Sequence, residues 1–160
     1  MTLEPIEIAA ATADDMMTLG RALGRAMVAG DVVGLAGPLG AGKTTLAQGI
    51  AEGLEVAAHR QVTSPTFALV NEHPARVPFV HADFYRLRNA AEVAELGLDE
   101  IFDDAAIVIE WVDLFPGAVP EDRLHVKISS TPQGVRTLTL EGRGPRGARL
   151  VASLAHARNA

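Results

Sequence analysis

Residues Gly37 to Thr44 read GPLGAGKT, a full match to the pattern G-x-x-x-x-G-K-[ST]. In such a loop the glycines let the backbone turn tightly, so that successive N–H groups point at the phosphates of a nucleotide. A lysine at the position of Lys43 reaches the β- and γ-phosphates, and a hydroxyl at the position of Thr44 coordinates Mg²⁺. The pattern therefore predicts a phosphate cradle, with nucleotide-binding residues Gly37, Leu39, Gly40, Ala41, Gly42, Lys43, Thr44 and Thr45.

The residues on both sides of the octet favour this interpretation. Residues 31–36 (DVVGLA) form a short apolar run suited to a buried strand, and residues 45–54 carry leucine and isoleucine at helical spacing. Strand, loop and helix thus follow in the order that a phosphate loop requires. The alternative is a glycine-rich helix cap without a ligand.

Composition indicates one domain inside the cell. The 160 residues, 48% of them hydrophobic, suffice for one buried core, so we expect a single domain over residues 1–160. The chain has no cysteine, which excludes disulfides and thiolate metal sites. The N-terminus shows no basic segment followed by an apolar one, and no apolar run approaches the about 18 residues of a membrane span. We therefore expect a cytoplasmic enzyme with no membrane contact.

The net charge of −6 argues against a domain that binds nucleic acid through its own electrostatics. One local exception is the stretch 143–158, which holds four arginines and no acidic residue. It is either the solvated face of a helix or a docking surface for an acidic partner or a phosphate backbone.

Periodicity along the chain predicts a three-layer α/β domain with a P-loop NTPase fold. Its sheet is expected to be parallel in the centre and antiparallel at the flanks, with the nucleotide at the carboxyl ends of the strands. A capping pattern at Thr12 opens the first helix, which Gly30 ends, and Pro78 moves its strand toward a sheet edge or a strand beginning. The expected strands are 2–10, 31–36, 67–70, 76–82, 105–109, 123–130 and 135–141, and the other expected helices are 45–54, 89–104 with a break at Gly97, and an additional one at about 145–158.

Two carboxylates directly follow expected strands, Glu110 after AAIVI and Asp83 after RVPFVHA. In a phosphate-loop enzyme one such carboxylate holds Mg²⁺ and another positions the attacking nucleophile. We assign the metal to Glu110 together with Thr44, and the orientation of water to Asp83, although exchanged roles also fit the sequence. With Lys43, these carboxylates are the candidate catalytic residues. Strand capping or pairing with arginines is the alternative for both.

Other side chains near these positions are candidates for contacts with the nucleotide. On an extended segment His81, Asp83 and Tyr85 share one face, which can look at the γ-phosphate, although His81 is also a plausible structural hydrogen-bonding residue. Thr66, in the stretch SPTF, is a candidate γ-phosphate contact. By topology, Thr12 and the loop after residue 130, with Thr131, flank the base.

Trp111 directly follows Glu110, and it is the only tryptophan. Opposite faces of the pleat would send one of these two side chains toward the core and the other toward the ligand. Trp111 is therefore either a packing anchor or an aromatic residue that faces a partner.

The segments GPLGAGKTT, TSPTF, HADFYRL, GLDEIF and IVIEW, in this order, resemble the TsaE (YjeE) family of bacterial ATPases over about residues 5–142. The resemblance implies ATP at 37–45, magnesium at Thr44 and Glu110, and functional roles for Asp83 and Trp111. It also implies work with TsaB and TsaD in the threonylcarbamoyl modification of adenosine 37 of tRNA, with tRNA reached only through that complex. Val112 stands where the family often has proline, and the helix after residue 144 lies outside the pattern.

Three functions compete at this stage. The first is an ATPase that drives a tRNA-modifying assembly, the second a small-molecule kinase, and the third a binding module gated by nucleotide. A kinase usually carries an arginine-rich lid that excludes water, and no such interior segment stands out. A GTPase is disfavoured because the chain has no N-K-x-D sequence.

Overall fold

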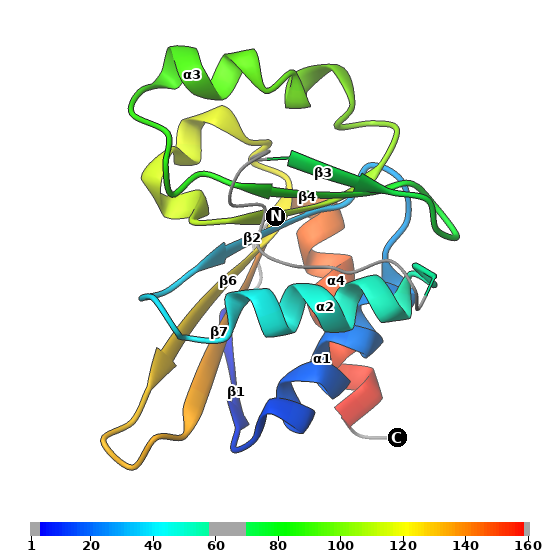
Figure 1. The fold of residues 1–160 in the computed structure, drawn as a ribbon. Coiled ribbons are helices and arrows are strands. Elements are labelled where there is room, and N and C mark those ends of the chain that lie inside the picture. The colour runs from blue at the N-terminus through cyan, green and yellow to red at the C-terminus, as the bar shows by residue number, and fades with distance from the viewer. Residues whose placement is uncertain (1–3, 58–69, 159–160) are drawn as a thin grey trace.

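Seven strands in one sheet form the centre of the protein (Figure 1). The computed structural model describes residues 4–57 and 70–158. In spatial order the sheet runs β1-β7-β6-β2-β5-β4-β3. The strands are β1 (Ile6–Ala10), β2 (Val32–Ala36), β3 (Val70–His73), β4 (Phe79–Asp83), β5 (Ala106–Glu110), β6 (Arg123–Ser130) and β7 (Arg136–Arg143).

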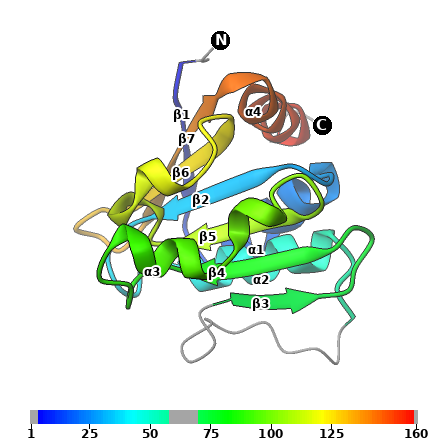
Figure 2. The same cartoon turned by 90° about the horizontal axis from the view of Figure 1, so that it is seen from above.

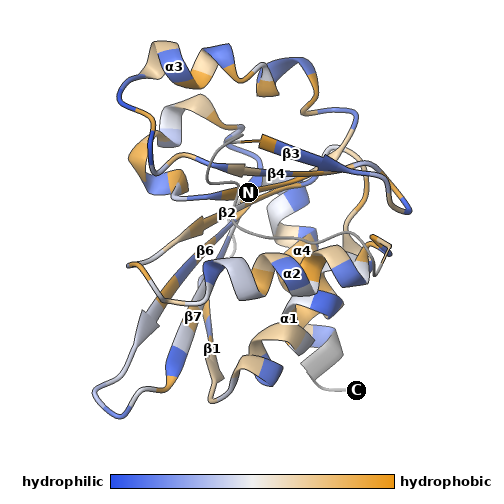
Figure 3. Cartoon of the chain, viewed as in Figure 1, coloured by the Kyte–Doolittle hydropathy of each residue, from blue (hydrophilic) through white to orange (hydrophobic). Residues whose placement is uncertain are grey.

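The directions of the strands confirm the predicted mixed sheet. β6, β2, β5 and β4 lie parallel to one another. The pairs β1–β7, β6–β7 and β3–β4 are antiparallel and form the two flanks. Every residue of β2, β4 and β5 is buried, as expected for strands covered on both faces, and Figure 3 shows these strands as mostly hydrophobic.

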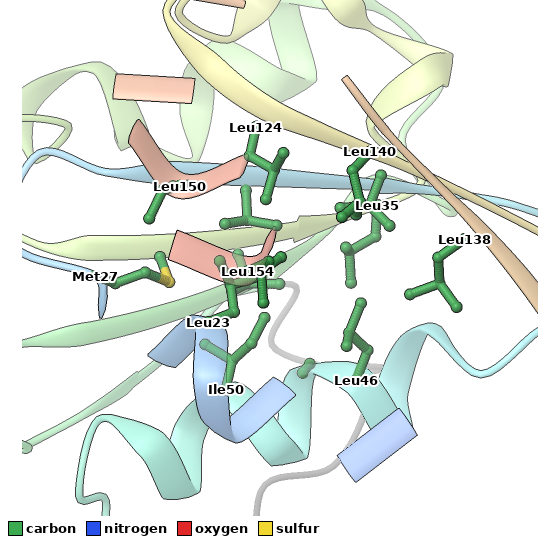
Figure 4. Packing of buried hydrophobic residues seen from close by; sticks show 14 of the residues in the cluster. Leu23, Met27, Leu35, Leu46, Ile50, Leu124, Leu138, Leu140, Leu150 and Leu154 are labelled. Carbon is green, nitrogen blue, oxygen red and sulfur yellow. The ribbon is translucent and has the colours of Figure 1, made fainter. Parts of the chain in front are cut away.

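Helices cover both faces of the sheet (Figure 2). One core lies between the sheet and the helices α1 (Ala13–Ala26), α2 (Lys43–Gly53) and α4 (Gly144–Arg158), and leucines from all three helices meet there (Figure 4). A second core packs under the short helix α3 (Ala90–Glu95) and the 3₁₀ turns 98–100, 112–114 and 116–118. None of the helices in the described part of the chain is long and apolar enough to span a bilayer.

α1 and α2 lie against each other backbone to backbone. The contact consists of Gly20 and Gly24 on α1 and Gly49 and Gly53 on α2. A Cβ added at Gly24 would lie 2.2 Å from the carbonyl oxygen of Ile50. Only glycine permits this approach, which fixes the position of the first residues of α2, and thus of the phosphate loop.

α1 begins where the sequence predicts and ends earlier. The Thr12 hydroxyl accepts from the Asp15 N–H, and the Asp15 carboxylate accepts from the Thr12 N–H, so the predicted cap is present. The helix stops at Ala26 rather than at Gly30, because Met27 has an extended backbone. Arg76 supplies the reason, since its Nη2 donates to the carbonyl oxygens of Gly24 and Met27 and satisfies the end of the helix.

The arginines of the C-terminal stretch pair with carboxylates of the chain itself. Arg146 and Arg149 on α4 both bind Asp31, whose side chain is fully buried before β2, and Arg143 binds Glu141. The two pairs with Asp31 attach α4 to the residue before β2, whereas the pair of Arg143 with Glu141 lies within β7. The side chains of Arg146 and Arg149 are 39% and 44% exposed, so these pairs are compatible with the predicted solvated face, and the docking surface stays a prediction.

Two strand predictions are also revised. β4 begins after Pro78, as predicted for a strand beginning, but it lies inside the sheet between β5 and β3 rather than at an edge. Asp83 and Glu110 are the last residues of their strands rather than the residues that follow them. Of the expected strand 67–70, only Val70 is described, and it begins β3. The predicted break at Gly97 is confirmed, since this residue has a φ of 72° between α3 and the next turn.

Candidate functional site

The glycine-rich octet forms the connection between β2 and α2. Gly40 and Gly42 have φ values of 76° and 109°, a region that other residues rarely adopt. Gly42 caps α2 without a side-chain hydrogen bond, and the first turn carries no acidic residue. No capping side chain therefore competes for the N-terminal N–H groups of α2, which suits this helix start to binding an anion.

Lys43 lies folded against the loop from which it projects. Its Nζ donates to the carbonyl oxygens of Gly37 at 2.6 Å and Pro38 at 2.8 Å. The ring of Trp111 lies 4.1 Å from the same ammonium, within the range of a cation–π contact. Burial lowers the pKa of Lys43, and the nearby carboxylates of Glu110, Asp113 and Asp83 offset part of that effect.

Glu110 is the carboxylate that reaches the octet. The Thr44 hydroxyl donates to its Oε1 at 3.1 Å, and Nε2 of His81 lies 2.5 Å from its Oε2. Glu110 is 2% exposed and His81 is fully buried. The structure therefore brings Thr44 and Glu110 together, as the assignment of a shared metal requires.

Asp83 lies beside Glu110, because β4 and β5 place the two residues directly opposite each other. Its Oδ1 accepts from the backbone N–H of Tyr85 at 2.8 Å. This turn ends the strand, so the expectation that Tyr85 shares an extended face with His81 and Asp83 is wrong. The ring of Tyr85 packs on Trp111 instead, with ring centroids 4.7 Å apart.

Trp111 leaves the strand and does not continue its pleat. Its φ is 60°, in the left-handed region, so the side chain returns over Lys43 rather than pointing to the face opposite Glu110. Both Glu110 and Trp111 thus reach the phosphate loop. Trp111 also packs against the second core, as the packing interpretation predicts, and its role in facing a partner stays a prediction.

A cavity of about 190 Å³ lies beside the octet, between the start of α1 and the β6–β7 turn. Its lining includes Thr12, as the sequence suggested, but not Thr131, whose hydroxyl accepts from the Val135 N–H. Gly134 and Arg136 line it from that side, and Nη1 of Arg136 donates to the Gly40 carbonyl oxygen at 2.8 Å. Arg136 was not predicted as a site residue, because its contact with Gly40 joins residues that are far apart in the sequence. Thr66 lies outside the described residues.

The ligand set suits magnesium. Thr44 offers a hydroxyl and Glu110 a carboxylate, the oxygen ligands that Mg²⁺ prefers. Within residues 4–57 and 70–158 no three or more histidine, cysteine or acidic side chains gather to hold a metal on their own. Magnesium usually needs only one or two protein ligands, because it keeps waters and binds substrate phosphates. The residues present therefore fit the expected ion.

Fold and site together define an α/β protein with a mixed seven-stranded sheet and a glycine-rich loop between the central strand β2 and α2. The family model described as "Threonylcarbamoyl adenosine biosynthesis protein TsaE" matches residues 10–138. The chain belongs to the TsaE family.

Individual relatives agree with this assignment. The chain is 43% identical over 141 residues to the tRNA threonylcarbamoyladenosine biosynthesis protein TsaE of Streptomyces coelicolor, covering 83% of this chain and 94% of the relative. It is 40% identical to the Bacillus subtilis protein of the same name, covering 73% of each. The crystal structure of Bacillus subtilis YdiB superposes with a TM-score of 0.84 at 28% identity, covering 99% of this chain and 98% of that one.

Proposed function

We propose that this protein is an ATPase of the P-loop NTPase class that supports the threonylcarbamoyl modification of adenosine 37 in tRNA. It acts with TsaB and TsaD counterparts in the cytoplasm and reaches tRNA through that complex. The names of its relatives support the pathway. The observation that carries the ATPase assignment is the contact of Thr44 with Glu110 directly beside the octet.

The residues of the site have separate roles in this proposal. The N–H groups of the octet and Nζ of Lys43 bind the phosphates, while Thr44 and Glu110 hold Mg²⁺, which neutralises charge on the phosphate oxygens. Asp83, beside Glu110, orients the attacking water. The cavity that Thr12 and Arg136 line accommodates the base. Thr131 is not part of that lining but belongs to the same turn as Gly134, which is. Thr66 is a candidate contact for the γ-phosphate.

Trp111 connects the nucleotide to partner proteins in this proposal. It contacts the phosphate-loop lysine on one side and the half-exposed Tyr85 on the other. A change in the position of Lys43 on binding phosphate therefore alters a surface that partners can contact.

The test is phosphate release from MgATP with no acceptor molecule present, measured alone and with the TsaB and TsaD counterparts. We expect slow turnover alone and faster turnover with both partners. Lys43→Ala is expected to lower turnover at least about tenfold, or about 1.4 kcal/mol, because the cation at the phosphates is lost. Lys127→Ala is the matched control, since this second lysine is exposed on β6.

Three results would contradict the proposal. Equal turnover by wild type and Lys43→Ala would show that the octet is not the site of ATP hydrolysis. Phosphate transfer that requires an added small-molecule acceptor would favour a kinase. A Glu110 variant that abolishes hydrolysis but supports the partners fully would favour a module gated by nucleotide.

A further inference from the structure

His81 makes a contact that the proposed roles of the site do not use. Its ring is fully buried in the middle of β4, and its Nε2 lies 2.5 Å from Oε2 of Glu110. In the sheet β4 pairs with β5 on one side and with β3 on the other. The backbone that carries His81 is therefore held from both sides.

The contact favours one tautomer of the imidazole. An ionised carboxylate only accepts hydrogen bonds, so a proton on Nε2 of His81 would serve this contact. Nδ1 is buried and has no hydrogen-bond partner among the described residues. The ring also stacks on Phe79, with centroids 6.2 Å apart, which restricts its rotation.

Glu110 is thus held by two donors from different elements, the Thr44 hydroxyl of α2 and the imidazole of β4. A carboxylate that is 2% exposed depends on such donors, because a buried charge without them is costly. Hydrogen bonds to a ligand residue also fix its orientation toward a metal. Without the imidazole, Oε2 would keep the longer contact of 3.3 Å with the Thr44 hydroxyl.

We propose that His81 is a positioning residue, which holds Glu110 in the orientation that binds Mg²⁺ with the nucleotide. This inference rests on the proposed function, since it assumes the metal role of Glu110. A histidine that served only to pack the core would not change the affinity for Mg²⁺ when replaced, whereas a positioning residue would.

The first experiment measures the dissociation constant of ADP in MgCl₂ and in EDTA by titration calorimetry, for the full chain. In wild type, Mg²⁺ is expected to strengthen binding. In His81→Ala, the strengthening of ADP binding by Mg²⁺ is expected to be about 10- to 100-fold smaller than in wild type. The affinity of this variant for ADP in EDTA is expected to stay within about twofold of wild type. His81→Gln, whose amide can donate to the same oxygen, is expected to restore most of it. His125→Gln serves as the matched control, because this histidine lies on β6, whereas His81 and Glu110 lie on the paired strands β4 and β5.

The outcomes separate the two proposals. If Mg²⁺ has no effect on ADP binding in wild type, the proposed metal site itself fails. If Mg²⁺ strengthens binding equally in wild type and His81→Ala, or if His81→Gln is as impaired as His81→Ala, the positioning role fails and the metal site stands.

A second measurement needs no variant, so it tests the positioning role of His81 even if His81→Ala does not fold. Wild-type protein with ¹⁵N-labelled histidine is examined by NMR with ADP in EDTA and then in MgCl₂. We expect His81 to carry its proton on Nε2, and we expect this signal to shift when Mg²⁺ is added, because the acceptor becomes a metal ligand. A proton on Nδ1, or an Nε2 signal that does not respond to Mg²⁺, would overturn the inference.

Discussion

Trp111 shows how one backbone angle determines which side chains meet at the site. A bulky residue with a φ of 60° is uncommon, and this conformation costs about 1–2 kcal/mol. The contacts of the ring with Lys43 and Tyr85 offset that cost, since cation–π and aromatic pairs contribute about 0.5–2 kcal/mol each. The strained turn after β5 therefore places an aromatic ring over the lysine of the phosphate loop.

Replacing Trp111 by alanine is expected to reduce turnover with the TsaB and TsaD counterparts more than it reduces nucleotide affinity. The reason is that the backbone of the octet still binds phosphate, while the surface beside Lys43 no longer responds to it. Nucleotide titrations and partner-stimulated phosphate release measure the two effects. Trp111→Phe is the control, because it keeps a ring over the ammonium, and we expect it to retain most of the stimulation. Equal stimulation of wild type and Trp111→Ala would exclude a coupling role for this residue.

The sequence predicts the residues of the site better than it predicts their contacts. The octet, Glu110 and Asp83 are readable because parallel strands end at one edge of a sheet, where the next side chains meet. The contact of His81 with Glu110 depends on the register of β4 against β5. The return of Trp111 depends on the sign of one φ angle, and the place of Arg136 depends on how the β6–β7 hairpin twists toward Gly40. Local residue patterns predict none of these three features, the contact of His81, the direction of Trp111 and the place of Arg136.

At the scale of elements, the position of the phosphate loop depends on the packing of α1 on α2. α1 begins at the cavity beside the octet, and α2 begins with Lys43. The glycines between them allow contact between backbones, so the two helix starts are held in one arrangement. The types of helix and strand were predictable from periodicity. The contact between the helices was not, because the sequence does not show which glycines of α1 meet which glycines of α2. The early end of α1 was also not predicted, because it depends on Arg76, which is distant in the sequence.

Gly24→Ala is expected to destabilise the protein by about 1–3 kcal/mol, because the new methyl group would lie 2.2 Å from the Ile50 carbonyl oxygen and must push the helices apart. The better helix propensity of alanine offsets about 1 kcal/mol of that loss. Urea unfolding measures the change, and nucleotide affinity is expected to fall with it, since α2 carries the loop.

Gly117→Ala is the control for this prediction, because a Cβ there meets nothing within 4 Å and the residue has no positive φ. A Gly24→Ala variant as stable as Gly117→Ala, with unchanged nucleotide affinity, would show that the helix contact does not set the position of the loop.

At the scale of the whole molecule, the strands gather the site at one end of the sheet, and four arginines of the described residues form ion pairs with carboxylates of the chain. The described ion pairs use Arg21 with Glu52, Arg143 with Glu141, and Arg146 and Arg149 with Asp31. Arg146 and Arg149 of the C-terminal stretch thus stabilise the attachment of α4 through Asp31. With a net charge of −6, the protein as a whole repels polyanions such as tRNA.

The isolated chain is therefore expected to bind tRNA no better than an unrelated acidic protein does. Because nonspecific binding comes from cations that displace counterions from phosphates, a chain with a net charge of −6 should bind more weakly than about 10⁻⁴ M. Fluorescence anisotropy of labelled tRNA at low and at physiological salt measures this, with and without the TsaB and TsaD counterparts. The double variant Asp103→Lys/Asp104→Lys, at two exposed positions, is a less acidic control and should bind somewhat better at low salt. Micromolar or tighter binding by wild type alone, with a steep dependence on salt, would place tRNA directly on this protein and contradict a role exerted through partners.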